Sequence, residues 1–151
     1  MRVRFTKLEE KAVTPTYGTK YSAGLDLSSI SNDTIAAGET KKIKTGIAIE
    51  IPDGYFGAIF ARSGLSTKKG LRPANCVGVI DSDYRGEIIV PLHNDSCEDR
   101  EIHEGDKVAQ LLIIPYIQAE LDKVQRLTET ERGIGGFGST DQFVDGIEAY
   151  I

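Results

Sequence analysis

Two carboxylates that lie two residues apart are the first feature of this sequence that could do chemistry. Asp81 and Asp83 belong to the segment GVIDSDYRG at residues 78–86. On an extended strand such side chains share one face, where they can orient a water molecule as a general base or help to hold a metal ion. A β-hairpin whose aspartates, serine and glycine serve only its turn accounts for the same residues. Taken alone, the segment favours that simpler interpretation.

An arginine follows an apolar stretch and opens a short helical segment. Residues 55–61 are nearly all apolar and predict a strand covered on both faces, and Arg62, Ser63 and Gly64 come directly after them. Ser63 is suited to cap a helix of two turns that Gly70 would end. The free N–H groups of a helix N-terminus and a guanidinium group both bind phosphate oxygens. An ordinary capped helix beside a surface arginine is the simpler explanation of this segment alone.

Two polar residues interrupt apolar segments. Gln110 lies within 108–117, the most apolar part of the chain, which predicts a strand buried on two sides. Its side-chain amide must therefore hydrogen-bond to the backbone or to a ligand. Asp26 lies in the apolar segment 23–27, where an unpaired carboxylate would be costly. Pairing with a buried arginine or with the backbone is the simplest structural account of Asp26.

The sequence changes in kind near its C-terminus. Residues 132–140 read RGIGGFGST and contain four glycines, so we expect this segment to be mobile when nothing is bound. Phe137 stands alone among the glycines and has no core of its own to join. These features predict a strap that closes over a ligand with an arginine, a ring and N–H groups. A disordered terminus is the alternative, and composition alone slightly favours it.

The elements that must position these residues are short β-strands. Isoleucines alternate over 47–51 before a Pro-Asp-Gly turn at 52–54, and apolar residues alternate again over 88–92. Pro91 places the second of these strands at a sheet edge or a bulge. Because turn signals recur between the runs and the chain has 16 glycines, it is predicted to be all-β, a barrel or a sandwich.

Length, charge and composition narrow the classes of function. The 151 residues suit one domain, no apolar run is long enough to span a membrane, and the charged N-terminus is not a signal peptide. We therefore expect a cytoplasmic protein. Cys76 and Cys97 fit free thiols, and a single disulfide between them is the alternative. His93 and His103 are isolated in the sequence, which argues against a structural zinc site. The net charge of −5 argues against nucleic-acid binding but allows one triphosphate held by arginines, N–H groups and a divalent cation.

Five segments, taken together and in order, resemble the signature motifs of the trimeric dUTPases. They are AGLDL at 23–27, RSGLS at 62–66, GVIDSDYRG at 78–86, EGDKVAQ at 104–110 and RGIGGFGST at 132–140. The resemblance covers residues 1 to 140. It implies an all-β fold, a distorted jelly-roll β-barrel over residues 1–131, assembled as a homotrimer with shared active sites at the subunit interfaces. It also implies a flexible, glycine-rich C-terminal arm, residues 132–151, that closes over the active site.

The same resemblance changes the expectation for the residues before the arm. Apolar residues recur there at helical spacing, at Ile117, Leu121, Val124 and Leu127. By analogy with the family, 108–117 and 120–127 are instead strands near the trimer contacts. Residues 141–151 extend beyond the last motif, and the sequence leaves open whether they form a docking segment or an unstructured end.

The resemblance implies hydrolysis of dUTP to dUMP and pyrophosphate, which limits the incorporation of uracil into DNA and supplies dUMP. Asp81 would orient the water that attacks the α-phosphorus, and Asp83 would help to position the sugar 3′-hydroxyl. Arg132 would meet the terminal phosphate as a third catalytic residue. Mg²⁺, held mainly by the substrate phosphates, is the implied cofactor, and Asp26 would touch it through water.

The implied substrate-binding residues surround the base, the sugar and the phosphates. Tyr84 would lie beneath the deoxyribose and leave no space for a 2′-hydroxyl, and Phe137 would stack on the uracil. The hairpin near 75–84 would recognise the uracil edge through its backbone. The implied set is Arg62, Ser63, Gly64, Asn75, Gly78, Val79, Tyr84, Gln110, Phe137, Gly138 and Ser139.

Two other functions stand beside the hydrolase. A dCTP deaminase shares this fold, but the tail with Arg132 and Phe137 and the segment 78–86 match the hydrolase pattern. A dUTP-gated regulatory protein would bind a protein partner. The intact Asp81 and Tyr84 argue against an enzyme that has lost its activity but leave such a second role open. Neither nucleic acid nor a membrane is expected as a partner.

Overall fold

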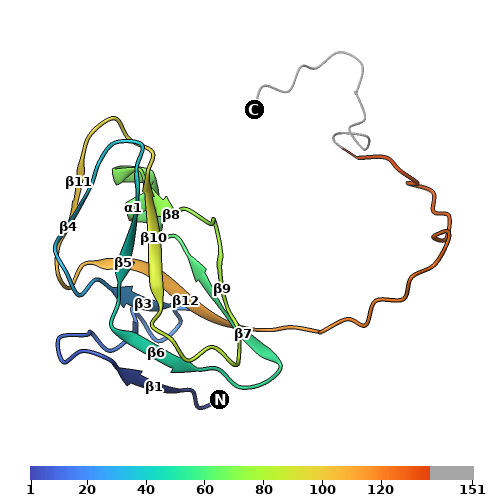
Figure 1. The fold of residues 1–151 in the computed structure, drawn as a ribbon, viewed down its shortest axis with the longest axis horizontal. Coiled ribbons are helices and arrows are strands. Elements are labelled where there is room, and N and C mark those ends of the chain that lie inside the picture. The colour runs from blue at the N-terminus through green and yellow to red at the C-terminus, as the bar shows by residue number, and fades with distance from the viewer. Residues whose placement is uncertain (137–151) are drawn as a thin grey trace. The chain divides into compact units, whose positions relative to one another are not determined.

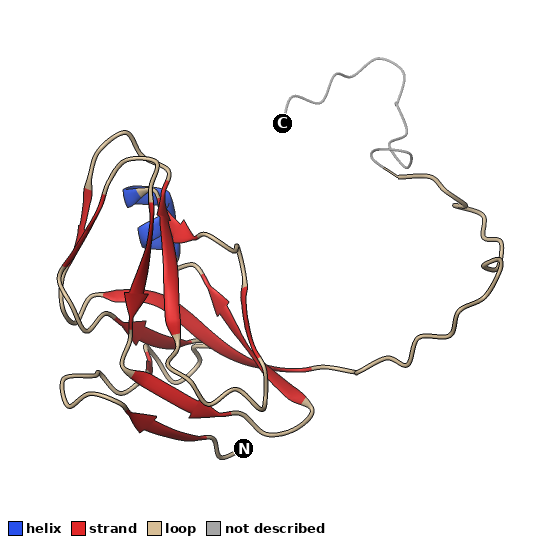
Figure 2. Ribbon diagram, viewed as in Figure 1, coloured by secondary structure: helices blue, strands red, loops and turns tan. Residues whose placement is uncertain are grey.

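The computed structural model describes residues 1–136. The chain divides into two compact units, Met1–Gln118 and Ala119–Ile151, and the second is described as far as residue 136. All strands and the single helix of the described residues lie in the first unit (Figure 1, Figure 2). In residues 1–136, no helix is long and apolar enough to cross a membrane.

Short strands joined by turns make up the first unit. In chain order, the elements are β1 (Arg4–Lys7), β2 (Thr16–Tyr17), β3 (Leu25–Ser28), β4 (Asp33–Ile35), β5 (Thr40–Lys44), β6 (Ile47–Glu50), β7 (Tyr55–Phe60), α1 (Ser63–Lys69), β8 (Leu71–Pro73), β9 (Gly78–Ile80), β10 (Ile89–Asn94), β11 (Arg100–Ile102) and β12 (Lys107–Pro115).

The strands pair antiparallel throughout the described residues. The largest sheet has the order β2-β3-β12-β7-β9, and a three-stranded sheet has the order β5-β10-β8. Two further pairs join β1 to β6 and β11 to β4. With one short helix among these strands, the structure confirms the all-β prediction.

Alternating aliphatic side chains fill the core. At and before β10, Ile88, Val90 and Leu92 are fully buried while Ile89 is partly exposed, as the alternation predicts. The β-branched side chains of Ile88 and Val90 suit these positions because they pack well on a pleated surface. Burying each such side chain stabilises the fold by about 1.5–3 kcal/mol. On β7, residues 57–59 are buried in succession, which agrees with a strand covered on both faces.

Pro91 does not mark a sheet edge. β10 is the central strand of its sheet and pairs without a register shift, so the prediction of an edge or a bulge is wrong. Pairing with β8 begins only at Leu92, and the Pro91 carbonyl accepts a hydrogen bond from the N–H of Ala74, just past the end of β8. The N and O of one residue point to the same side of a strand. Pro91 therefore lacks an N–H on the side of β10 that faces β8. Because the pairing with β8 ends at this position, the loss of the donor is tolerated.

The segment after β12 is neither the helix that its periodicity favours nor the strand expected from the family. Residues 120–127 have no regular secondary structure, and β12 ends at Pro115 rather than Ile117. Ile117, Leu121 and Leu127 are 95%, 94% and 81% exposed. A strand needs a neighbouring edge for its N–H and C=O groups, and within residues 1–136 of one chain no strand pairs with this segment.

The short strand β4 is tied to β5 through one carboxylate. The Lys41 ammonium lies 2.8 Å from Oδ1 of Asp33, and the Ser31 hydroxyl donates to its Oδ2 at 2.6 Å. Burial raises the pKa of Asp33, but the hydrogen bonds from Lys41 and Ser31 and the charge of Lys41 together outweigh it, so the pKa lies below its ordinary value of 3.8. The ionised form is therefore favoured in the folded state.

We expect Asp33→Asn to lower the free energy of unfolding at neutral pH by roughly 1 kcal/mol, a value reduced by solvent screening. Because the folded-state pKa is depressed, the contribution of Asp33 is fully present above 3.8 and is lost as the pH falls through the folded-state pKa. Urea unfolding at neutral and at acidic pH measures this. At acidic pH the difference in the free energy of unfolding between Asp33→Asn and the wild type should disappear. A difference that persists unchanged there would contradict the stabilising role of the ionised Asp33. Asp53→Asn, at an exposed turn, is the control.

Candidate active site

A hollow of about 970 Å³ gathers polar residues from three of the five motif segments of the sequence, 23–27, 62–66 and 104–110. Its lining includes five of the predicted site residues, Asp26, Arg62, Ser63, Gly64 and Gln110. Strand register explains why they meet. β12 lies between β3 and β7, so Gln110 is opposite Asp26 on one side and opposite Phe60 on the other. Arg62 follows Phe60 by two residues, which brings it to the same end of the sheet.

Asp26 holds two cations in this hollow. Its Oδ1 lies 3.2 Å from Nε of Arg62, and its Oδ2 lies 2.7 Å from Nζ of Lys107. The Asp26 side chain is only 14% exposed, and a buried carboxylate needs positive partners. Arg62 and Lys107 supply that positive charge. Of the two predicted partners for Asp26, a buried arginine or the backbone, the structure has an arginine, although the Arg62 side chain is partly exposed. We call these three residues the Asp26 cluster.

Sequence reasoning missed Lys107. It lies in the segment EGDKVAQ, where only Gln110 drew attention as a polar residue among apolar ones. The pairing of β12 with β3 shifts register between Lys107 and Ala109, a bulge at the start of the strand. Bulges re-aim side chains near the end of a ladder. The one signal in the sequence was a lysine near the start of an apolar strand, because the strand that pairs with it, β3, carries the carboxylate of Asp26.

Gln110 orders the backbone that leads to Arg62. Its Nε2 donates to the carbonyl of Ala61 at 2.8 Å, so the predicted partner is backbone in this structure. Gly24 faces the same amide, because a Cβ at that position would lie 2.8 Å from Oε1 of Gln110. A side chain there would push Gln110 away from Ala61. The glycine of AGLDL therefore leaves room for the Gln110 amide to reach the Ala61 carbonyl.

The helix α1 begins at the hollow. Arg62 is its N-cap, with φ −89° and ψ 126°, and no side chain caps its N-terminus, so the prediction that Ser63 is the cap is wrong. Ser63 is instead the first helical residue. The Arg62 carbonyl accepts from the N–H groups of Leu65 and Ser66. The earlier N–H groups lack a capping side chain, and a phosphate oxygen can take that place. Gly70, with φ 67°, ends the helix as predicted.

The hairpin after β9 carries a second group of predicted residues. Asn75, Gly78 and Val79 line a separate hollow of about 290 Å³ next to Ile59 on β7. β9 pairs with β7 at this point, with Gly78 opposite Ile59, and a Cβ on Gly78 would lie 3.1 Å from the Ile59 Cβ. A side chain at Gly78 would therefore be tightly packed against Ile59 where β9 pairs with β7.

Asp81 and Asp83 do not share the face of an extended strand. β9 ends at Ile80, and a turn follows in which the N–H of Tyr84 donates to the carbonyl of Asp81 at 3.2 Å. The turn that the segment alone favours is therefore confirmed, and the alternative of two carboxylates on one face of an extended strand is wrong because the chain reverses here. Both carboxylates are exposed, and the Tyr84 hydroxyl donates to the carbonyl of Glu87 at 3.0 Å. Asp81, Asp83 and Tyr84 line neither hollow.

Arg132 belongs to the second unit. Its Nε donates to the carbonyl of Gly135 at 2.9 Å, and its side chain is exposed. Phe137, Gly138 and Ser139 lie outside the described residues. The free thiols predicted for Cys76 and Cys97 are confirmed, and both are exposed.

The donors in the large hollow fit a metal that arrives with phosphate. Among residues 1–136, no group of three or more His, Cys, Asp and Glu side chains could hold a metal ion. Both oxygens of Asp26 already face cations. Mg²⁺ commonly binds through one or two carboxylates together with waters and phosphate oxygens. Because both of its oxygens are already paired, Asp26 would meet such an ion through water and not as a direct ligand.

Antiparallel sheets and a hollow lined by cations and the start of a helix define a β-protein with a site that suits a phosphorylated ligand. A family model described as dUTPase matches residues 10–141, and the chain belongs to the dUTPase family.

Relatives match over nearly their whole length. The deoxyuridine 5′-triphosphate nucleotidohydrolase of Nautilia profundicola is 50% identical over 140 residues, which cover 93% of this chain and 99% of that protein. The protein of the same name from Desulfitobacterium hafniense is 45% identical over 143 residues, which cover 93% and 95%.

Solved structures share the fold. The dUTPase of Staphylococcus bacteriophage 80alpha with dUPNHPP has a TM-score of 0.86 and 29% identity, over 92% of this chain and 98% of that one. It is described in terms of phage dUTPases that control the transfer of virulence genes by a G protein-like mechanism. A mutant dUTPase from phage phi11 of S. aureus, described as coordinating a structural Mg(II) ion, has a TM-score of 0.80 and 28% identity, over 85% and 100%.

Proposed function

We propose that this protein hydrolyses dUTP to dUMP and pyrophosphate by attack of water on the α-phosphorus. The observation that carries the proposal is the hollow in which Asp26, Arg62, Ser63, Gly64 and Gln110 meet. The relatives named deoxyuridine 5′-triphosphate nucleotidohydrolase support the same reaction. The reaction supplies dUMP and, because it removes dUTP, keeps uracil out of DNA.

The phosphates bind in the large hollow. Arg62 donates charge-assisted hydrogen bonds to phosphate oxygens, and Ser63 and Gly64 present N–H groups at the start of α1. Gln110 holds the Ala61 carbonyl and so fixes the backbone from which Arg62 extends. When Mg²⁺ is bound with the substrate, it neutralises phosphate charge, and Asp26 meets it through water.

The nucleoside binds at the hairpin. The backbone at Asn75, Gly78 and Val79 reads the edge of the uracil, and an unmatched donor there would cost about 1–3 kcal/mol. Tyr84 lies beneath the deoxyribose and excludes a 2′-hydroxyl. Asp83 positions the 3′-hydroxyl. Asp81 orients the attacking water and accepts its proton, a role that suits its exposed place in the turn.

The active form is a homotrimer with shared active sites, built on a jelly-roll barrel. Two features of the single chain support this. The phosphate residues and the hairpin residues line two separate hollows. The apolar side chains of Ile117, Leu121 and Leu127 are also left exposed, which a partner subunit would cover. One subunit would then supply the phosphate hollow and another the hairpin.

Residues 132–151 form the arm that completes the site. Arg132 meets the terminal phosphate, Phe137 stacks on the uracil, and Gly138 and Ser139 offer N–H and hydroxyl groups to the phosphates. Stacking of a base on an aromatic ring contributes about 1–3 kcal/mol. The exposed free thiols of Cys76 and Cys97 support a reducing, cytoplasmic location.

Pyrophosphate release from dUTP, dCTP, dTTP and UTP, with Mg²⁺ and side by side, tests the proposal. We expect release from dUTP alone. Release from UTP would contradict the role of Tyr84, and ammonia from dCTP would indicate a deaminase. Absence of release from all four nucleotides would overturn the hydrolase.

A dUTP-gated regulatory role is a second candidate, favoured by the description of the phage 80alpha enzyme. It predicts a protein partner whose capture depends on dUTP. A pull-down from cell extract with and without dUTP separates the two activities, because hydrolysis needs no partner.

A further inference from the structure

Three cations line the phosphate hollow of the described chain, and they differ in their partners. Arg62 and Lys107 are both paired with Asp26. Lys69, the last residue of α1, lines the same hollow and forms no ion pair within residues 1–136. Its charge is therefore available to a ligand without the loss of an existing contact.

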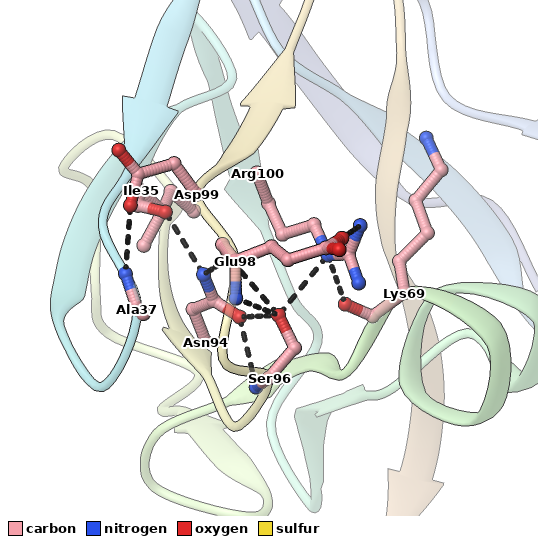
Figure 3. A network of polar contacts seen from close by, with 8 residues as sticks. All are labelled: Ile35, Ala37, Lys69, Asn94, Ser96, Glu98, Asp99 and Arg100. Carbon is pink, nitrogen blue, oxygen red and sulfur yellow. Dashed lines mark hydrogen bonds and ion pairs between the residues drawn. The ribbon is translucent and has the colours of Figure 1, made fainter.

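The backbone of Lys69 is held firmly at the end of the helix. Nε of Arg100 donates to the Lys69 carbonyl at 2.9 Å and to the Ser96 hydroxyl at 3.1 Å. The Ser96 hydroxyl donates in turn to Oδ1 of Asn94 at 2.7 Å. Asn94 is fully buried, and its Nδ2 donates to the carbonyls of Ile35 and Glu98 at 2.9 and 2.8 Å (Figure 3). A buried side chain thus anchors the C-terminal end of α1.

A second contact reinforces this anchor. The N–H of Asp95 donates to the Gly70 carbonyl at 2.8 Å, and a Cβ on Gly70 would lie 3.1 Å from the backbone N of Ser96. The loop after β10 therefore lies against the residue that ends the helix. α1 has no fully buried residue of its own. These polar contacts therefore hold its C-terminal end, while Leu65 packs against the core nearer its start.

The Lys69 side chain is directed by the helix. Helical side chains lean toward the helix N-terminus, so Lys69 leans back toward the end that carries Ser63. Figure 3 shows the side chain extending away from the network while its carbonyl oxygen faces Arg100. A lysine in the last turn of a helix is commonly explained by the helix dipole. That explanation applies equally to Lys68, which does not line the hollow.

We propose that Lys69 is a further substrate-binding residue that contacts the β- and γ-phosphates, the part of the substrate that leaves as pyrophosphate. This inference rests on the proposed function, since the nucleoside end is assigned to the hairpin and the hollow around Lys69 to the phosphates. dUMP lacks the two terminal phosphates. Lys69 therefore discriminates triphosphate from product, which favours release of dUMP.

The test compares Lys69→Gln with Lys68→Gln, its neighbour on the same helix. For Lys69→Gln we expect the Kd of inorganic pyrophosphate, measured by calorimetry, and the KM for dUTP each to rise by about fivefold, the effect of one exposed ion pair. The inhibition constant of dUMP should stay within about twofold, as should all three constants in Lys68→Gln. Lys69→Arg keeps the charge and should restore pyrophosphate binding.

Two outcomes overturn the inference. One is an equal effect of Lys69→Gln and Lys68→Gln, which would show that Lys69 contributes only to the overall positive charge of the helix end. The other is weaker binding of dUMP by the same factor as pyrophosphate. If the wild-type protein releases no pyrophosphate from dUTP, the proposed function fails. The calorimetric comparison with inorganic pyrophosphate still decides the role of Lys69, because it does not depend on turnover.

Discussion

Replacing Asp81 by alanine is expected to lower kcat for dUTP by at least about a hundredfold, the usual loss when a general base is removed. Binding of dUTP should change little. The contact that Asp81 makes within the turn uses its backbone carbonyl, which accepts from the N–H of Tyr84, and alanine keeps that carbonyl. The hairpin should therefore retain its shape while the carboxylate is lost. Steady-state kinetics and calorimetry with dUTP measure the two quantities separately.

Asp53→Ala is the matched control for this prediction. Asp53 is also an exposed aspartate in a turn between strands, and it lines neither the phosphate hollow nor the hairpin hollow. Its kcat should stay within about twofold of the wild type. Preserved turnover in Asp81→Ala would remove Asp81 from the reaction. Loss of dUTP binding together with turnover would instead make it a binding residue.

Replacing Arg132 by alanine is expected to lower kcat by up to about 10³-fold, by comparison with arginines that stabilise charge on a transferring phosphate. The only hydrogen bond or ion pair of its side chain among the described residues is the hydrogen bond to the carbonyl of Gly135, so the substitution should leave the first unit intact. Pyrophosphate release under saturating dUTP is the measurement. Removal of residues 132–151 should reduce turnover at least as far.

Arg126→Ala controls for the loss of an arginine in the same unit. Arg126 is exposed and pairs with Glu129. Its removal should leave kcat within about twofold, as expected for an exposed ion pair. Equal losses from both arginine substitutions would point to the net charge of the segment rather than to a specific contact of Arg132.

Much of the phosphate hollow could be anticipated from the sequence because its residues depend on local patterns and on burial. A carboxylate in an apolar strand must be paired, and Asp26 is paired with Arg62. A glutamine in a buried strand must be hydrogen-bonded, and Gln110 is bonded to the backbone. A glycine that follows a helical run ends the helix, as Gly70 does.

The turn at Asp81 could be anticipated as well, because it is a local feature closed by the N–H of Tyr84 three residues later. The errors elsewhere have their physical origin in tertiary context. The presence of Pro91 could not reveal that the β8 ladder stops just short of it. Lys107 enters the hollow through a bulge, which shifts register without a mark in the sequence.

The Asp26 cluster gives two of the cations in the hollow an internal counterion before any ligand arrives. A phosphate that reaches Arg62 and Lys107 therefore exchanges places with a carboxylate of the protein, and few dissolved ions are released by that exchange. Affinity for a triphosphate should then fall less steeply with added salt than three cations would imply. Substrate binding in this hollow should therefore depend only weakly on ionic strength.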